Sequence, residues 1–359
     1  MTQPTNPVSP TSGAPVSTPA QDATVLERAL FEVKRVIVGQ DRMIERMFVS
    51  LLARGHVLLE GVPGVAKTLA VETLAKVVGG TFSRIQFTPD LVPADIIGTR
   101  IYRQSSEKFD VELGPVFVNF LLADEINRAP AKVQSALLEV MAEQQVSIGG
   151  QTYDVPRPFL TMATQNPIEQ EGVYPLPEAQ RDRFLMKIHV GYPSDVEERE
   201  IVYRVSVRIP EPVPVLNPAE LISLQSKADD VFVHNALVDY AVRLVIATRA
   251  PAEHGLADVA QLIQYGASPR ASLGIVRAAR ALALLRGRDY ALPQDVQDIA
   301  PDILRHRLVL SYDALADDIP ADEIVARVLA AVPPPTVAPR QNAAPTSGAP
   351  LPTGAWPGR

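Results

Sequence analysis

A glycine-containing turn near residue 60 has the residue types that bind phosphate. The stretch Gly61-Val-Pro-Gly-Val-Ala-Lys-Thr68 follows an apolar run, His56 to Leu59, and precedes a helical stretch, Leu69 to Val78. Small residues let backbone N–H groups approach phosphate oxygens, and the N-terminus of the helix adds partial positive charge. A chance glycine-rich turn is the alternative, but the strand, turn and helix context favours a phosphate-binding loop.

Within this loop, Lys67 and Thr68 have separate expected tasks. We expect Lys67 to reach the β and γ phosphates of ATP and Thr68 to bind Mg²⁺ through its hydroxyl. The general motif has glycine before the lysine, whereas this chain has Ala66; we expect a small cost, because alanine tolerates a helical backbone at the start of the helix. The residues predicted to bind the nucleotide here are Gly61, Val62, Pro63, Gly64, Val65, Ala66, Lys67, Thr68 and Leu69.

Two acids follow a second apolar run, Phe120 to Ala123. The carboxyl ends of parallel strands are where ligands bind, so Asp124 is expected to hold Mg²⁺ through its water shell. Glu125 is expected to orient and deprotonate the attacking water. Such a pair alone is often a solvated turn, but its position after the phosphate loop, with another strand between them, makes the hydrolytic interpretation more specific.

Polar side chains elsewhere could complete the site. Asn166 follows the apolar run Phe159 to Thr164, and its amide could hydrogen-bond the γ-phosphate or the lytic water, although an asparagine before proline is also a common turn. Arg181 and Arg183 precede the last apolar run, and Arg270 begins a long helical stretch. An arginine from outside the loop can accelerate phosphoryl transfer by about 10³-fold to 10⁵-fold, although most arginines are surface or ion-pair residues.

The elements that must position these residues alternate along the chain. Short apolar runs at 56–59, 84–87, 120–123, 159–164 and 185–190 are separated by helical stretches such as 131–143. This alternation predicts a parallel sheet with crossover helices, a three-layer αβα sandwich. After Tyr192-Pro193 the runs give way to helical periodicity at 195–205, 236–250, 270–285 and 294–303, which predicts a smaller all-α lid domain.

This pattern divides the chain into four predicted segments. They are a disordered Pro-rich segment at 1–22, an ATPase core at 23–192, a helical lid at 193–332 and a disordered Pro-rich tail at 333–359.

Composition removes several classes of function. The net charge of −7 disfavours a protein held on nucleic acid, which needs a basic face. Without cysteine, the chain has no disulfide or zinc-thiolate site. The first 21 residues lack a signal peptide pattern, and no stretch is long and apolar enough to span a membrane. We therefore expect a cytoplasmic protein.

Together these motifs resemble MoxR-type AAA-plus ATPases, a resemblance that covers about Val25 to Val332. It is carried by four stretches: Gly61 to Thr68, Leu121-Leu-Ala-Asp-Glu-Ile-Asn-Arg-Ala129, Ala163-Thr-Gln-Asn-Pro167 and Gly266-Ala-Ser-Pro-Arg270. The alanine at position 66 is ordinary in this family.

The resemblance implies a ring, a hexamer, with ATP between subunits. Asn166 would be sensor 1, Arg270 sensor 2 and Arg183 the arginine finger, with Arg181 as a second candidate. Val38 and Gly39 would belong to the loop on the adenine side. The alternating stretch 145–155, with Gly149-Gly150 at its centre, predicts a hairpin that resembles the helix-2 insert of this branch.

The resemblance also implies a chaperone-like motor that matures or activates protein complexes. Because the two domains leave no room for a von Willebrand factor A domain, such a domain is expected on a separate partner. A nucleic-acid motor or a metal-chelatase-type subunit of the same branch is the alternative, as is a scaffold that binds ATP with little turnover. Acidity disfavours the nucleic-acid motor, and the presence of Glu125 and Asn166 disfavours the scaffold.

Overall fold

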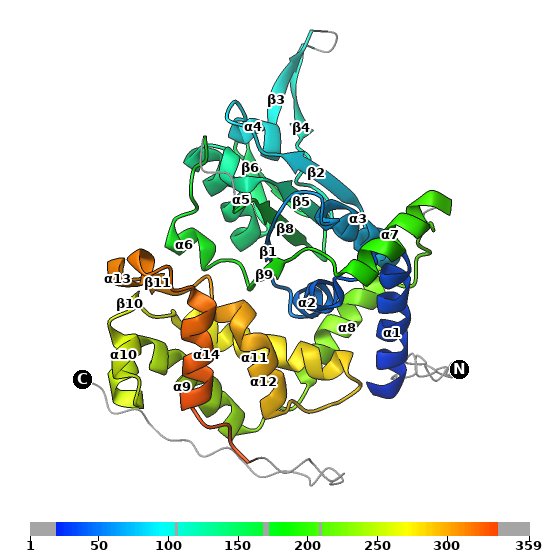
Figure 1. The fold of residues 1–359 in the computed structure, drawn as a ribbon. Coiled ribbons are helices and arrows are strands. Elements are labelled where there is room, and N and C mark those ends of the chain that lie inside the picture. Colours follow the sequence, from blue (N-terminus) through cyan, green and yellow to red (C-terminus); the bar gives the residue numbers. More distant parts are fainter. Residues whose placement is uncertain (1–18, 105–106, 168–171, 208–209, 337–359) are drawn as a thin grey trace, which may run out of the picture.

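A five-stranded parallel sheet forms the centre of the first half of the chain (Figure 1). The computed structural model describes residues 19–104, 107–167, 172–207 and 210–336. The strand order is β2-β5-β8-β1-β9. These strands are β1 (Val57–Gly61), β2 (Phe82–Gln86), β5 (Phe120–Asp124), β8 (Leu160–Gln165) and β9 (Met186–Val190). Each predicted strand is confirmed, with ends shifted by no more than two residues.

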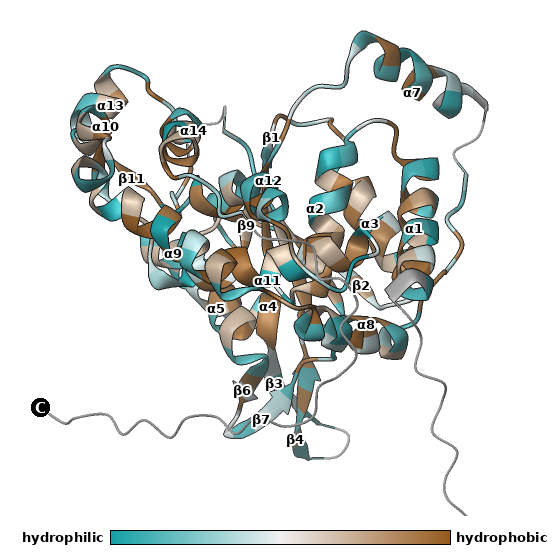
Figure 2. Ribbon diagram, turned by 90° about the horizontal axis from the view of Figure 1, so that it is seen from below, coloured by the Kyte–Doolittle hydropathy of each residue, from teal (hydrophilic) through white to brown (hydrophobic). Residues whose placement is uncertain are grey.

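Helices cover both faces of this sheet, which confirms the three-layer sandwich. In β5, Phe120 and Leu122 face a core shared with α1, α2, α3 and the lid, whereas Leu121 and Ala123 face α4 and α5. Apolar residues accordingly gather between the layers, and hydrophilic residues lie mainly on the outer helix surfaces (Figure 2). The helices of this part are α1 (Pro19–Val36), α2 (Asp41–Leu52), α3 (Lys67–Val78), α4 (Pro93–Ile97), η1 (Ile126–Arg128), α5 (Ala131–Glu143) and α6 (Glu178–Arg181).

Two β-hairpins extend from this core. The predicted hairpin at 145–155 is confirmed as β6 (Gln145–Ile148) and β7 (Gln151–Asp154). A second hairpin, β3 (Gly98–Arg103) with β4 (Lys108–Leu113), was missed because its strands lack a clear alternation of buried and exposed residues.

The second hairpin corrects one prediction. It continues directly from α4, the helix that follows the second strand of the sheet, and it projects from the core in Figure 1. Counted from the first strand of the sheet, α4 is the second helix of the core, so the helix-2 insert is the hairpin β3–β4. The assignment of 145–155 to the helix-2 insert is wrong, since β6–β7 lies between α5 and β8.

The remainder of the chain is helical, as predicted, and packs beside the core (Figure 1). It also carries one short antiparallel pair, β10–β11, which the helical periodicity does not predict. Its elements are α7 (Asp195–Val207), α8 (Pro218–Asp230), α9 (Asn235–Arg249), η2 (Pro251–His254), α10 (Ala257–Ala260), β10 (Ile263–Tyr265), α11 (Pro269–Leu285), α12 (Pro293–Leu304), β11 (Val309–Leu310), α13 (Tyr312–Ala316) and α14 (Ala321–Ala331).

The terminal segments differ from the prediction at one point. Helix α1 begins at Pro19, so residues 19–22 are helical rather than part of a disordered segment. Residues 1–18 and 337–359 lie outside the described part of the chain, and the other segment boundaries stay predictions. A helix suited to crossing a bilayer is absent from the residues that the structure describes.

Candidate active site

The phosphate loop lies where β1 ends and α3 begins. A side chain at Gly61 would collide with the Val190 carbonyl oxygen, 2.3 Å from the Cβ position, because β1 and β9 pair closely there. At Gly64 the backbone has φ +85° and nothing lies within 4 Å of a Cβ position. Glycine therefore permits both the close strand packing and the open, left-handed turn that a phosphate group needs.

Ala66 differs from the prediction. We expected a helical backbone at this position, but Ala66 has φ 59° and ψ 21°, in the left-handed region. This conformation costs an L-residue roughly 1–2 kcal/mol, whereas glycine adopts it freely. Glycine thus occurs at this position of the general motif because it adopts a left-handed backbone without strain. This chain has alanine there and carries the backbone strain.

Lys67 is the first residue of α3, and its Nζ donates a hydrogen bond to the Gly61 carbonyl oxygen at 2.5 Å. Burial lowers the pKa of Lys67, while the nearby charges of Asp124 and Glu125 act in the opposite direction. The ammonium therefore lies across the loop, within the field of the two acids. Thr68 is half-buried in the first turn of the same helix.

Asp124 is buried at the end of β5, and both of its carboxylate oxygens are bound. Arg84, on the neighbouring strand β2, donates to Oδ2 from Nε at 3.0 Å and from Nη2 at 2.6 Å. The Thr164 hydroxyl, on β8 at the other side, donates to Oδ1 at 2.5 Å. The carboxylate is thus held in one orientation from both neighbouring strands.

Glu125 follows with a left-handed backbone, φ 56°. Its Oε2 accepts from Gln86 Nε2 at 2.7 Å and pairs with Arg128 Nε at 3.0 Å. The backbone N–H of Glu125 donates to Thr164 Oγ1 at 2.8 Å. A strained backbone held by several contacts is typical of a functional position.

Asn166 is buried directly after β8, which lies between β5 and β1. The phosphate loop, the two acids and this amide therefore meet at one edge of the sheet. Four residues that bind the acids were not predicted from the sequence: Arg84, Gln86, Arg128 and Thr164. The alternation of polar Arg84 and Gln86 along a predicted strand was the available signal for two of them.

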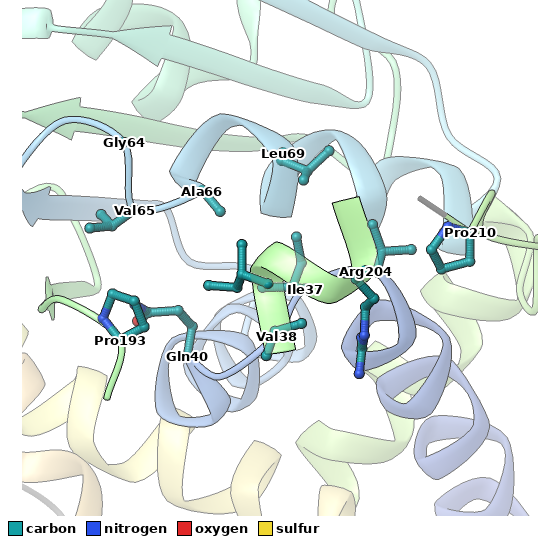
Figure 3. A pocket seen from close by; sticks show the side chains of 12 residues that line it. Ile37, Val38, Gln40, Gly64, Val65, Ala66, Leu69, Pro193, Arg204 and Pro210 are labelled. Atoms are coloured by element: carbon teal, nitrogen blue, oxygen red, sulfur yellow. The ribbon is translucent and has the colours of Figure 1, made fainter. Parts of the chain in front are cut away.

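An apolar pocket adjoins the loop (Figure 3). The predicted residue Val38 lines it, whereas Gly39 does not; the Glu197 carboxylate lies against the Gly39 backbone instead. Helix α7 closes one side, because Arg204 donates to the carbonyl oxygens of Lys34 and Arg35 at the end of α1. The lining residues are Val36, Ile37, Val38, Gln40, Gly64, Val65, Ala66, Leu69, Pro193, Ile201, Arg204 and Pro210.

The predicted arginines lie at the opposite edge of the sheet. Arg181 and Arg183 precede β9, so they lie beside the start of β1 rather than its end. A five-residue strand at roughly 3.3 Å per residue spans about 15 Å. Arg183 and Arg270 line a common cleft that also includes His56. The structure therefore brings the arginines near each other but not near the phosphate loop of the same chain.

The residues at the loop fit a magnesium–nucleotide complex. The open turn at Gly64, the start of α3 and Lys67 form a cradle for anionic groups. Thr68 and Asp124 supply hard oxygen atoms, which Mg²⁺ prefers. The apolar pocket beside them suits a flat, uncharged base.

Fold and site together define an AAA-type ATPase with a helical lid. Residues 56–186 match the family described as "ATPase family associated with various cellular activities (AAA)", and residues 256–328 match the AAA lid domain.

Individual relatives identify the family within this group of ATPases. The chain is 67% identical to Chaperone MoxR1 of Mycobacterium tuberculosis over 93% of this chain and 87% of that protein. It is 36% identical to Protein MoxR of Methylorubrum extorquens over 78% of this chain and 86% of that one. A crystal structure of a candidate ATPase from Cytophaga hutchinsonii has a TM-score of 0.84 at 48% identity, covering 89% of this chain and 97% of that chain. The chain belongs to the MoxR family of AAA ATPases.

Proposed function

We propose that this chain hydrolyses Mg-ATP at the interfaces between subunits of a ring. The observation that supports the proposal is that the expected site residues lie at two separate edges of the sheet. The phosphate loop and the acids occupy one edge, and Arg183 and Arg270 occupy the other. Neither arginine can reach the phosphate loop of its own chain across the sheet. A neighbouring subunit that presents its arginine edge to this loop would complete the site.

Within one subunit, the roles follow from position. Lys67 binds the β and γ phosphates after exchanging its bond to the Gly61 carbonyl oxygen. Thr68 and Asp124 would hold Mg²⁺, which would neutralise charge on the phosphates. Asp124 would do so through water molecules, since Arg84 and Thr164 already bind its oxygens.

Glu125 accepts the proton of the attacking water. Both of its described side-chain contacts involve Oε2, so Oε1 is the oxygen that can turn toward a water molecule. Asn166, buried between the acids and the loop, would donate to the γ-phosphate without adding negative charge.

The neighbour contributes the positive charge. Arg183 is exposed at the edge of the cleft, which suits it to the role of the arginine finger, and Arg181 is partly buried with a weak pairing to Glu178 at 3.7 Å. Charge develops on the equatorial oxygens of the γ-phosphate during transfer, and an arginine from the next subunit stabilises it. We favour a hexamer as the ring.

We also propose that the ring acts as a chaperone for protein complexes. Support comes from the relative named Chaperone MoxR1, which shares most of its length with this chain. We propose a separate protein with a von Willebrand factor A domain as the partner. Capture on a tagged Glu125→Gln protein with ATP, compared with capture by Lys67→Ala, tests this: an A-domain protein should be enriched only by the former, and its absence contradicts the partner.

The nucleotide chemistry has a direct test. Lys67→Ala should lose ATP binding measured by calorimetry, whereas Glu125→Gln should bind ATP as the parent does and lose turnover. Hydrolysis by Glu125→Gln at the parent rate would show that another group is the base.

A further inference from the structure

Asp182 lies between the two candidate finger arginines, and its carboxylate joins the core to the lid. Its two oxygens share the single hydroxyl proton of Ser268, whose Oγ lies 3.0 Å from Oδ1 and 2.9 Å from Oδ2. Arg270 Nη1 lies 3.4 Å from its Oδ2. One side chain of the segment before β9 thus contacts two residues at the start of α11.

Ser268 fixes the start of α11. Its side chain caps this helix by accepting from the Arg270 backbone N–H at 3.2 Å, while its hydroxyl proton goes to Asp182. The first turn of α11 is therefore tied to the Asp182 carboxylate through the residue that caps it. Arg270, two residues further on, takes its position from this turn.

Arg307 fixes the other side of the same carboxylate. It is buried, donates from Nε to Asp182 Oδ1 at 2.7 Å and donates from Nη2 to the Phe184 carbonyl oxygen at 2.6 Å. The lid therefore binds the segment on both sides of position 183. Arg183 itself is exposed and directed by a backbone that these contacts hold.

The two arginines that contact Asp182 differ in how tightly they are held. The Arg307 side chain is 3% exposed, whereas that of Arg270 is 59% exposed and has its long contact to Asp182. Arg270 can therefore exchange Asp182 for a phosphate oxygen while Arg307 and Ser268 keep the carboxylate in place.

We propose that Asp182 is a positioning residue that holds Arg183 of the core and Arg270 of the lid as one unit facing the neighbouring subunit's nucleotide. This inference rests on the proposed function, because it assumes that these arginines act in trans. Besides carrying the arginine finger, the segment 181–183 then links the position of the lid to the position of that finger.

Asp182→Asn tests the inference, since asparagine keeps the shape but removes the charge. ATP affinity and KM should stay at the parent values, because the phosphate loop lies at the other edge, while kcat should fall about tenfold or more through misplaced arginines. Asp182→Glu should recover part of kcat. The pair Asp182→Asn with Arg270→Ala should lower kcat by less than the product of the two single effects, since the two changes damage one unit.

A matched control separates positioning from stability. Asp298 pairs the core residue Arg46 at 2.6 Å and the lid residue Arg286 at 2.5 Å, with its side chain 30% exposed. Asp298→Asn should lower the melting temperature and leave kcat unchanged. Parent-level kcat in Asp182→Asn, or an equal loss in both variants, would overturn the inference.

A milder pair covers the case in which Asp182→Asn does not fold. Ser268→Ala removes the hydroxyl that binds Asp182, and Ser311→Ala removes a comparable helix cap at α13. Only Ser268→Ala should lower kcat; full activity in the folded protein would reject the proposal. A fall in kcat for Arg183→Ala without one for Asp182→Asn would reject this inference alone, whereas no effect of Arg183→Ala would reject the trans-acting site itself.

Discussion

Gln86 Nε2 donates a 2.7 Å hydrogen bond to Glu125 Oε2, across from β2 to the residue that follows β5. Arg128 binds the same oxygen. An uncharged amide and a guanidinium thus both bind Oε2 of this carboxylate. These contacts orient the proposed base before any substrate binds.

Removing the amide should slow hydrolysis without removing the base. In Gln86→Ala, Glu125 keeps Arg128 but loses one of its two side-chain contacts, so we expect kcat to fall several-fold, well short of the roughly 10²-fold or greater loss expected for Glu125→Gln. ATP affinity should not change. Steady-state kinetics beside calorimetry measure both, and a kcat for Gln86→Ala as low as that of Glu125→Gln would contradict a purely orienting contact.

Arg183→Ala should slow turnover by about 10³-fold with ATP affinity unchanged, because the side chain lies at the edge of the sheet remote from its own phosphate loop. Mixing Arg183→Ala subunits with Glu125→Gln subunits should restore part of the activity, since some interfaces then combine an intact base with an intact arginine. No recovery at any mixing ratio would argue that both residues serve the same subunit.

Ala66→Gly should stabilise the protein. The backbone at Ala66 is left-handed, and glycine removes a strain of about 1 kcal/mol, so the free energy of unfolding should rise by up to that amount. The matched control is Ala70→Gly in the helix that follows, α3, which should lower the free energy of unfolding by roughly 1 kcal/mol because the backbone there is right-handed. Urea unfolding measures the free energy of unfolding of both variants. An equal loss of stability in the two would mean that the loop relaxes around alanine.

Acid should destabilise the fold through His56. Burial lowers the pKa of His56 to about 4 from a usual value of 6.5. The buried ring lies between the Thr161 N–H, which donates to Nδ1, and the Met141 carbonyl oxygen. Between pH 6.5 and about 4, the unfolded chain therefore binds a proton at His56 that the folded chain does not bind. The stability present above pH 6.5 is lost as the pH falls toward 4, about 2.5 kcal/mol by pH 4.5.

The variant His56→Gln isolates this effect. Glutamine cannot be protonated in this range, so the difference in unfolding free energy between pH 7 and pH 4.5 should shrink by about 2.5 kcal/mol. Part of the acid sensitivity should persist, because burial also lowers the pKa of His306 well below its usual value. An unchanged pH dependence in His56→Gln would show that His56 titrates normally.

The sequence was most informative where local chemistry is distinctive. The five strands, the helix at 131–143 and the order of phosphate loop, acids and Asn166 all follow from hydrophobic periodicity and short motifs. The hairpin β3–β4 was missed because period-two alternation is weak when most side chains on both faces of a hairpin are exposed. Likewise, nothing local indicates that Ala66 adopts a left-handed backbone, since this depends on the closed shape of the loop.

The sequence by itself indicated the kind of chemistry, because the residue types of Lys67, Thr68, Asp124 and Glu125, and their places after strands, are those expected of an ATPase. Only the tertiary structure decided which side chains meet. Strands β2 and β8, distant in sequence from β5, bring Arg84 and Thr164 to Asp124 from either side. The direction of β9 and the packing of the lid carry Arg183 and Arg270 to the far edge, since parallel strands place their amino ends together, away from the carboxyl ends where Asp124 and Asn166 lie.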